Sequence, residues 1–123
     1  MAMDVGQSTA NALYQQAVDG TFRMEPGAAK ACADSYQTFI SSVDQMLRSA
    51  STLHKISGFG TFESAKALED GFSRKGQALT EALIGLQQAA AKMAAAYLLA
   101  GNMIDEAEAA NKKSIALTAG NIE

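Results

Sequence analysis

Apolar residues recur along most of this chain at alternating steps of three and four, the spacing that places side chains on one face of an α-helix. The first apolar stripe consists of Ala29, Cys32, Tyr36, Phe39, Val43, Met46, Ala50 and Leu53. The second consists of Ala65, Leu68, Phe72, Lys75, Leu79, Ala82, Leu86, Ala89, Met93, Ala96, Ala100, Met103 and Ala107. Lys75 is its one charged member. Both stripes have the heptad spacing of helices that pack on each other, so the chain is predicted to be all-α.

A short segment of glycine and aromatic residues, Ser57 to Phe62, separates the two stripes. A glycine inside a helix costs about 1 kcal/mol relative to alanine, so two glycines so close together indicate a break. The sequence therefore predicts a turn over residues 57–61, with Gly58, Phe59 and Gly60 at its centre. The two stripes then become the arms of an antiparallel helix-turn-helix hairpin.

Residues that start and stop helices bound the two predicted arms. Pro26 is tolerated in a first helical turn, where a backbone N–H has no helical partner, so the first arm is predicted over about residues 26–56. The second arm is predicted over about residues 62–118, with Gly120 as a C-cap. It is therefore the longer arm.

Glycines within the second arm weaken it, and we expect any break at residues 71–76 or near residue 101. A short amphipathic helix, about residues 8–19, precedes the arms and ends at Gly20. All of these elements belong to a single helical domain, residues 1–123. Because the first arm is too short to cover the last third of the second, the cover there is either this N-terminal helix or a second chain.

Composition excludes several classes of partner. Hydrophobic residues make up 48% of the chain and aromatic residues only 7%, which suits tightly packed helices better than a deep pocket. The net charge is −3, so the chain lacks the basic face that nucleic acids require. Its start has neither the cationic nor the apolar region of a signal peptide, which predicts synthesis in the cytoplasm. The most apolar run, Met93 to Ala100, is shorter than the roughly 20 residues that span a bilayer.

Residues that carry chemistry are sparse. His54 is the one histidine and Cys32 the one cysteine, and neither has a second ligand at the spacing of a metal site. Cys32 lies on the first stripe, where it is expected to act as a small hydrophobe. No serine has a base placed to activate it, and no glycine-rich phosphate loop follows a strand-like run. We therefore expect no enzymatic activity, no metal and no cofactor.

The segment Gly58-Phe59-Gly60, followed by Thr61-Phe62-Glu63-Ser64-Ala65, resembles the turn of the WXG-type (ESAT-like) proteins of type VII (ESX) secretion. The run Gly20 to Pro26 and the residues Leu68, Gly71, Phe72 and Lys75 extend the resemblance to a tryptophan-less actinobacterial branch. Proteins of that family are helical hairpins that pair into four-helix bundles. The tryptophan of their Trp-x-Gly turn is absent here.

A secretion signal is the second feature that the resemblance implies. The family places Tyr-x-x-x-Asp/Glu just beyond an Ala-Gly near the end of the second helix. Here Ala100-Gly101 is followed by Ile104 in the place of the tyrosine and by Glu108 in the acidic place. The resemblance therefore implies either a weakened signal made by Ile104 and Glu108, or export through a partner that carries the full signal.

The uncovered stripe and the resemblance together predict a dimer, homo- or heteromeric, that completes a four-helix bundle. Its predicted core and interface residues are Phe39, Val43, Met46, Leu47, Leu79, Leu83, Leu86, Met93 and Tyr97. The expected function is export as a folded bundle to the cell surface or medium, without a cleavable signal peptide, by docking to the type VII motor. Two alternatives remain: a cytoplasmic adaptor or chaperone that delivers a larger toxin or effector to the same system, and a membrane-active helical protein.

Overall fold

The computed structural model describes residues 4–50 and 63–122, and every regular element in these ranges is a helix. The helices are α1 (Gln7–Asp19), α2 (Pro26–Ala50), α3 (Glu63–Ala100) and α4 (Ile104–Ile122). The predicted all-α class is therefore confirmed. The predicted turn at Gly58-Phe59-Gly60, the residues at the predicted end of the first arm and His54 lie outside the described residues.

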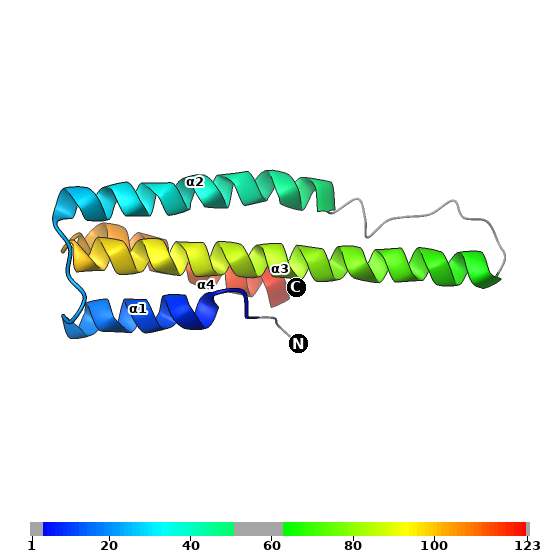
Figure 1. Cartoon of the computed structure of the whole chain (residues 1–123), viewed down its shortest axis with the longest axis horizontal. Coiled ribbons are helices and arrows are strands. Elements are labelled where there is room, and N and C mark those ends of the chain that lie inside the picture. The colour runs from blue at the N-terminus through cyan, green and yellow to red at the C-terminus, as the bar shows by residue number, and fades with distance from the viewer. Residues whose placement is uncertain (1–3, 51–62, 123) are drawn as a thin grey trace.

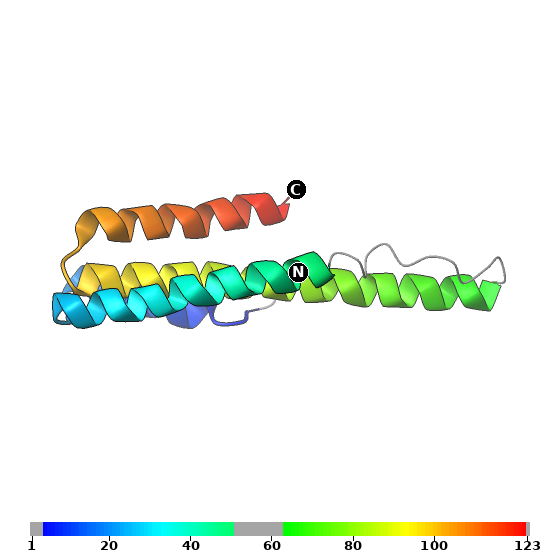
Figure 2. The ribbon, with the colours of Figure 1, turned by 90° about the horizontal axis from the view of Figure 1, so that it is seen from above.

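Helix α3 forms the axis of the molecule, and each of the other three helices packs on it (Figure 1). Viewed from above, α2 runs along α3 in the opposite direction while α4 lies on a different side of the same axis (Figure 2). With 38 residues α3 is about 57 Å long, whereas the 25 residues of α2 span about 38 Å. The N-terminal end of α3 therefore projects beyond α1, α2 and α4 (Figure 1).

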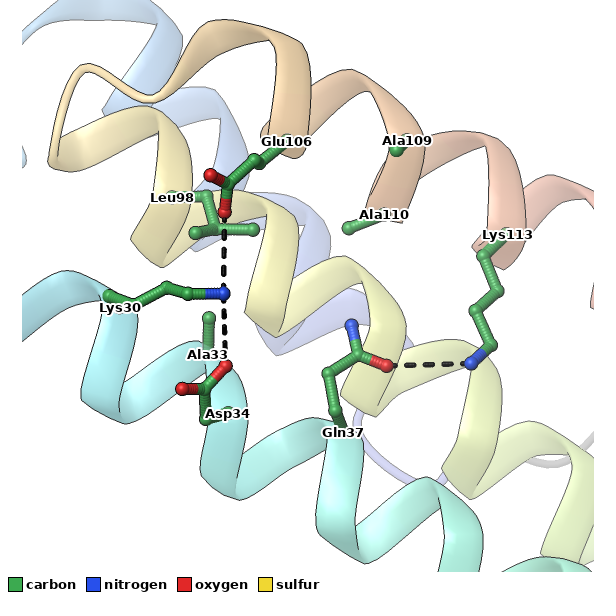
Figure 3. Close-up of a pocket in the computed structure, with 9 residues that line it drawn as sticks. All are labelled: Lys30, Ala33, Asp34, Gln37, Leu98, Glu106, Ala109, Ala110 and Lys113. Atoms are coloured by element: carbon green, nitrogen blue, oxygen red, sulfur yellow. Dashed lines mark hydrogen bonds and ion pairs between the residues drawn. The ribbon is translucent and has the colours of Figure 1, made fainter.

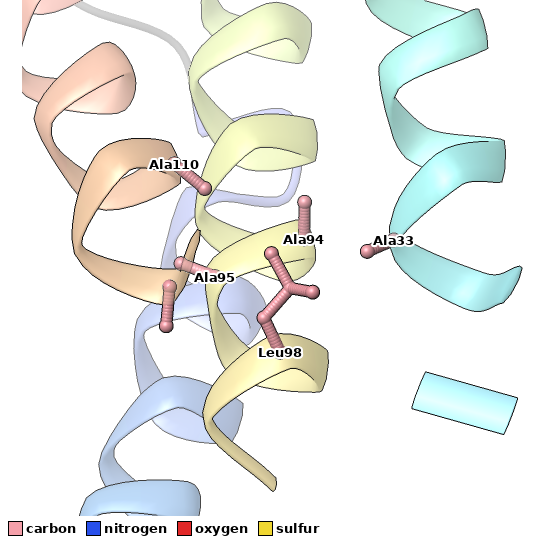
Figure 4. Packing of buried hydrophobic residues seen from close by; sticks show 6 residues of the cluster. Ala33, Ala94, Ala95, Leu98 and Ala110 are labelled. Carbon is pink, nitrogen blue, oxygen red and sulfur yellow. The ribbon is translucent and has the colours of Figure 1, made fainter. Parts of the chain in front are cut away.

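Alanines of α3 build the core where the three helices surround it. Ala91, Ala94, Ala95 and Ala96 are completely buried. Their small side chains let neighbouring helix backbones approach α3 from several sides at once. The largest buried cluster joins three helices and consists of Ala33, Ala94, Ala95, Leu98, Ala107 and Ala110 (Figure 4).

This three-sided cover accounts for the almost uniformly apolar run from Met93 to Ala100. The span Ala65–Ala100 contains a window of mean hydropathy 1.2, which is long and apolar enough to cross a membrane by length and composition. Within the molecule, 56% of that window is buried. Burial against α1, α2 and α4 is sufficient to explain its apolarity.

Helix α2 begins at Pro26, as the sequence predicts. Glu25 caps it, since one carboxylate oxygen accepts the N–H of Gly27 at 3.0 Å and the other accepts that of Ala28 at 2.9 Å. These two bonds favour the ionised carboxylate and lower the pKa of Glu25 below its ordinary value. Helix α1 ends at Gly20, whose φ of 82° is the left-handed conformation of a C-terminal glycine cap.

The predicted second arm is two helices, because the chain leaves α3 after Ala100. Asn102 takes a left-handed φ of 64° and donates its N–H to Leu99 O, while Met103 donates its N–H to Leu98 O at 2.8 Å. This pair of bonds is a Schellman motif. The break falls near residue 101, one of the two predicted positions, whereas α3 continues without interruption through residues 71–76.

Close packing explains why the break falls at Gly101. A Cβ atom at this position would lie 2.6 Å from the Cβ of Ala29 and 3.4 Å from the Cα of Pro26, so only glycine fits against the start of α2. The Met24 N–H also donates to Ala100 O at 3.0 Å, which satisfies a carbonyl at the end of α3.

Beyond the break, α4 folds back along α3. The last third of the predicted second arm therefore contributes cover, and the C-terminal half of α3 needs no second chain to bury it. The prediction that Gly120 caps the arm is wrong, because α4 continues through it to Ile122. A helix passes through glycine at a modest cost when neighbouring residues favour it.

Candidate functional site

The residues predicted for the core and dimer interface divide into two groups. Val43 and Leu83 are buried between α2 and α3, with Leu47 and Leu86 partly buried against them. These side chains stabilise the single chain.

Tyr97 also belongs to the inner group. Its ring stacks on that of Tyr36 at a centroid distance of 5.7 Å, and the ring of Phe22 approaches it edge-on at 5.5 Å. These ring contacts hold α3 against α2 and against the segment that precedes α2. Burial, followed by the electrostatic interaction with Tyr97, raises the pKa of Tyr36 above its ordinary value.

The second group lies on the surface. Phe39 is 40% exposed, Met46 51% and Leu79 43%, and the heptad pattern of α3 continues outward to Leu68 at 52% and Phe72 at 44%. We call these five residues the apolar face. Leaving one such side chain in water forfeits about 1.5–3 kcal/mol relative to full burial, so a row of five favours a partner that covers it.

The apolar face continues across α2 and α3 as one surface. A groove of about 300 Å³ brings Phe39 of α2 together with Leu86 and Met93 of α3. Because α2 and α3 run in opposite directions, one heptad forward from Phe39 reaches Met46, and one heptad back from Leu86 reaches Leu79. Met46 and Leu79 therefore lie at the same level along the pair of helices.

A second groove, between α2 and α4, carries paired charges (Figure 3). Lys30 Nζ lies 3.2 Å from Asp34 Oδ1 and 3.4 Å from Glu106 Oε2, and Lys113 Nζ donates to Gln37 Oε1 at 3.4 Å. The hydrogen bond and charge of Asp34, followed by those of Glu106, raise the pKa of Lys30. The contacts of Lys30 with Glu106 and of Lys113 with Gln37 connect α2 with α4 at the surface.

A partly buried polar contact connects α1, α3 and α4. Lys92 Nζ lies 4.1 Å from the centre of the Tyr14 ring and donates to Asn111 Oδ1 at 2.5 Å. Partial burial lowers the pKa of Lys92. The ammonium is stabilised by the π-face of one helix and the amide oxygen of another, so its role is structural.

Gln87 is a buried polar residue that the sequence analysis did not identify. It is 1% exposed, and its Nε2 donates to Ile40 O at 3.0 Å and to Asp44 Oδ1 at 2.6 Å. Because one buried amide nitrogen on α3 donates to two groups one turn apart on α2, the two bonds fix the register of α2 against α3. A polar residue on the inner side of the second stripe is the only signal that could have pointed to it.

The candidate secretion signal lies at the start of α4. Ile104 is its first residue and is 55% exposed, and Glu108 follows one turn later on the surface. Residues four apart project from one side of a helix, so both side chains are accessible together. Sequence analysis placed them inside the second arm, whereas they begin a separate helix after the bend at Gly101.

Among residues 4–50 and 63–122, no group of three or more histidine, cysteine, aspartate or glutamate side chains could hold a metal ion. Comparisons with models of protein families, with curated proteins and with solved structures find no match to this chain.

Proposed function

We propose that this protein is a non-enzymatic, partner-binding component of type VII (ESX) secretion, exported as a folded helical dimer or together with a partner. The observation that carries the proposal is the apolar face on α2 and α3. It presents aromatic, leucine and methionine side chains at heptad spacing, the pattern with which one helix binds another. The described helices of the chain leave this apolar face partly exposed, and a bound partner would cover it.

Two further features support export by this route. The hairpin that the resemblance implies requires long neighbouring arms that run in opposite directions, and α2 and α3 have that arrangement. The exposed side chains of Ile104 and Glu108 offer the secretion motor an apolar anchor and a negative charge one turn apart.

An export assay in a type VII-competent host tests the proposal. We expect Glu108→Ala to abolish the appearance of the protein in the culture filtrate and Ile104→Tyr to increase it. Asp105→Ala is the matched control, because Asp105 is also acidic and exposed in the first turn of α4 but points from a different side. Unchanged export of the Glu108→Ala chain would refute a role for this helix as a signal.

The second candidate function is a cytoplasmic adaptor or chaperone that delivers a larger toxin or effector to the same system. Ile104 favours it, since an isoleucine stands where the family's signal has tyrosine. In that case the apolar face would bind the cargo. Co-expression with chromosomal neighbours separates the two functions: an adaptor stays in the cell while its partner reaches the filtrate.

A further inference from the structure

A polar pocket lies between α1, α3 and α4. Both α1 and α4 pack on α3, and each contributes residues to the pocket (Figures 1 and 2). Its volume is about 250 Å³, and its lining consists of Gln7, Asn11, Gln88, Lys92, Ser114 and Ile115. All of these side chains except Ile115 are polar, whereas the groove beside Phe39 is mostly apolar.

The N-terminal segment builds one wall of this pocket because Gly85 lets it approach α3. A Cβ atom at Gly85 would lie 2.7 Å from Gln7 Nε2 and 2.9 Å from Val5 Cγ2. The Gln7 amide is held there by two bonds, since its Oε1 accepts the Val5 N–H at 2.7 Å and its Nε2 donates to Gln88 Oε1 at 3.4 Å. This wall therefore requires a glycine on α3.

Amide nitrogens of the pocket have donors to spare. Because Gln88 accepts from Gln7 through its Oε1, the Nε2 of Gln88 is the group that can bind a ligand, and it donates to no described residue. The side chain of Asn11 is exposed on α1 and has no partner among residues 4–50 and 63–122. Each of these amides offers two N–H donors.

Besides its structural role, Lys92 gives the pocket a positive charge, and no carboxylate of a described residue forms an ion pair with it. Of the three N–H donors of an ammonium, one binds Asn111 Oδ1 at 2.5 Å and a second faces the Tyr14 ring. Partial burial lowers the pKa of Lys92, the direction expected for a cation that has lost water without gaining an anion.

A pocket with unused donors and one cation is complementary to a ligand that offers acceptors and a negative charge. A carboxylate does so, since its two oxygens carry about four lone pairs and no hydrogen. Its bond to an ammonium is charge-assisted and therefore stronger than a bond between neutral groups. Ile115 lines the pocket and is 61% exposed, so a short hydrocarbon chain attached to the carboxylate has an apolar side chain to lie against.

We propose that this pocket binds a small organic carboxylate with a short apolar chain, held by the Lys92 ammonium and by the amide nitrogens of Asn11 and Gln88. The ligand bonds α1 and α3 together, so its binding stabilises the folded chain. None of the lining residues belongs to the apolar face or to the pair Ile104 and Glu108. The site is therefore independent of the proposed export.

NMR titration of the isotope-labelled chain with butyrate tests the site. We expect saturable shifts of the backbone amide signals at Asn11, Gln88 and Ser114, with a dissociation constant of millimolar order because so small a ligand has few atoms with which to bind. Butylamine has the same chain and the opposite charge, and it should shift none of them. Shifts that do not saturate, or equal shifts with butyrate, inorganic phosphate and chloride, would overturn the proposal.

Substitutions in the pocket test the residues that hold the ligand. Lys92→Met removes the charge, keeps most of the aliphatic stem and should weaken butyrate binding by about tenfold. Lys112→Met, the same change at an exposed lysine of α4 outside the pocket, is the matched control and should bind like the parent.

Asn11→Ala is the second variant, because Lys92 also holds Tyr14 and Asn111 and its loss could disturb the fold. The Asn11 side chain bonds no described residue, so this variant should keep the fold of the parent and weaken butyrate binding by about threefold. Gln16→Ala, at an exposed residue of α1 outside the pocket, is its control.

Binding by Asn11→Ala as tight as that of the parent, or an equal weakening by Gln16→Ala, would overturn the proposal. Titration uses the purified chain and needs no export. A chain that binds butyrate but never reaches the culture filtrate therefore removes only the proposed function. A chain that is exported but does not bind butyrate removes only this inference.

Discussion

The two halves of α3 carry the same heptad spacing in opposite surroundings. The C-terminal half is enclosed by α1, α2 and α4, and its stripe consists largely of alanine. The N-terminal half has only the end of α2 beside part of its length, and its stripe carries Leu68, Phe72 and Leu79 at the surface. Side-chain size therefore distinguishes a stripe that the chain's own helices bury from a stripe that lies at the surface. Alanine permits three backbones to approach one helix, whereas large side chains serve a helix that a partner covers.

Enlarging a covered alanine gives the largest expected effect. Ala94 is fully buried and faces Ala33 of α2 (Figure 4), so Ala94→Leu must force α3 and α2 apart. We expect a loss of about 3 kcal/mol in the free energy of unfolding, measured by urea denaturation. Ala78→Leu makes the same change at an exposed position of the N-terminal half and should cost less than about 0.5 kcal/mol. Equal losses at both positions would remove the contrast between the halves.

Deleting the buried amide gives the next largest effect. Gln87→Ala removes the donor to Ile40 O and Asp44 Oδ1 and leaves a cavity at a residue that is 1% exposed. We expect a loss of about 2 kcal/mol. Gln87→Leu keeps most of the volume and should lose about half as much, since only the bonds are missing. A Gln87→Leu chain as unstable as Gln87→Ala would show that the bonds, rather than the packing, carry the stabilisation.

The sequence predicted the features that depend on local signals. The arms follow from apolar spacing, and the start of α2 follows from Pro26, whose effect is confined to the first helical turn. Glycine content also marked the neighbourhood of residue 101. These signals act within a few residues and need no knowledge of the fold.

What the sequence did not predict depends on contacts between distant residues. The break became a reversal because Gly101 lies against Ala29 and because the Met24 N–H bonds Ala100 O. The apolar stripe itself could not show that α4 folds back to cover α3. Likewise, spacing alone assigned Val43 and Met46 to one interface, although the first is buried in the chain and the second lies on its surface.

Weakening the Glu25 cap tests how much the start of α2 contributes to the stability of the fold around the C-terminal half of α3. Glu25→Gln weakens the bonds to Gly27 and Ala28, so the variant should be less stable than the parent at pH 7. Because folding lowers the pKa of Glu25, its contribution is present above the ordinary value of 4.5 and is lost as the pH falls through the lower, folded value. The difference in melting temperature between the two chains should therefore shrink below pH 4.5. A difference that persists at low pH would locate the effect elsewhere.

Truncating a leucine of the N-terminal half of α3 gives the smallest expected effect on the single chain. Leu68 is half-exposed, so Leu68→Ala at a concentration where the protein is monomeric should change the free energy of unfolding by less than about 0.5 kcal/mol. The matched variant in the enclosed half is Leu98→Ala, at a residue 4% exposed, which should lose about 2–5 kcal/mol by leaving a cavity. At high concentration the Leu68→Ala chain should instead lose stability relative to the parent, because association stabilises the folded parent and not the variant. A large loss in the monomer would mean that Leu68 is part of the chain's own core, and the apolar face would then be a smaller surface than its exposure indicates.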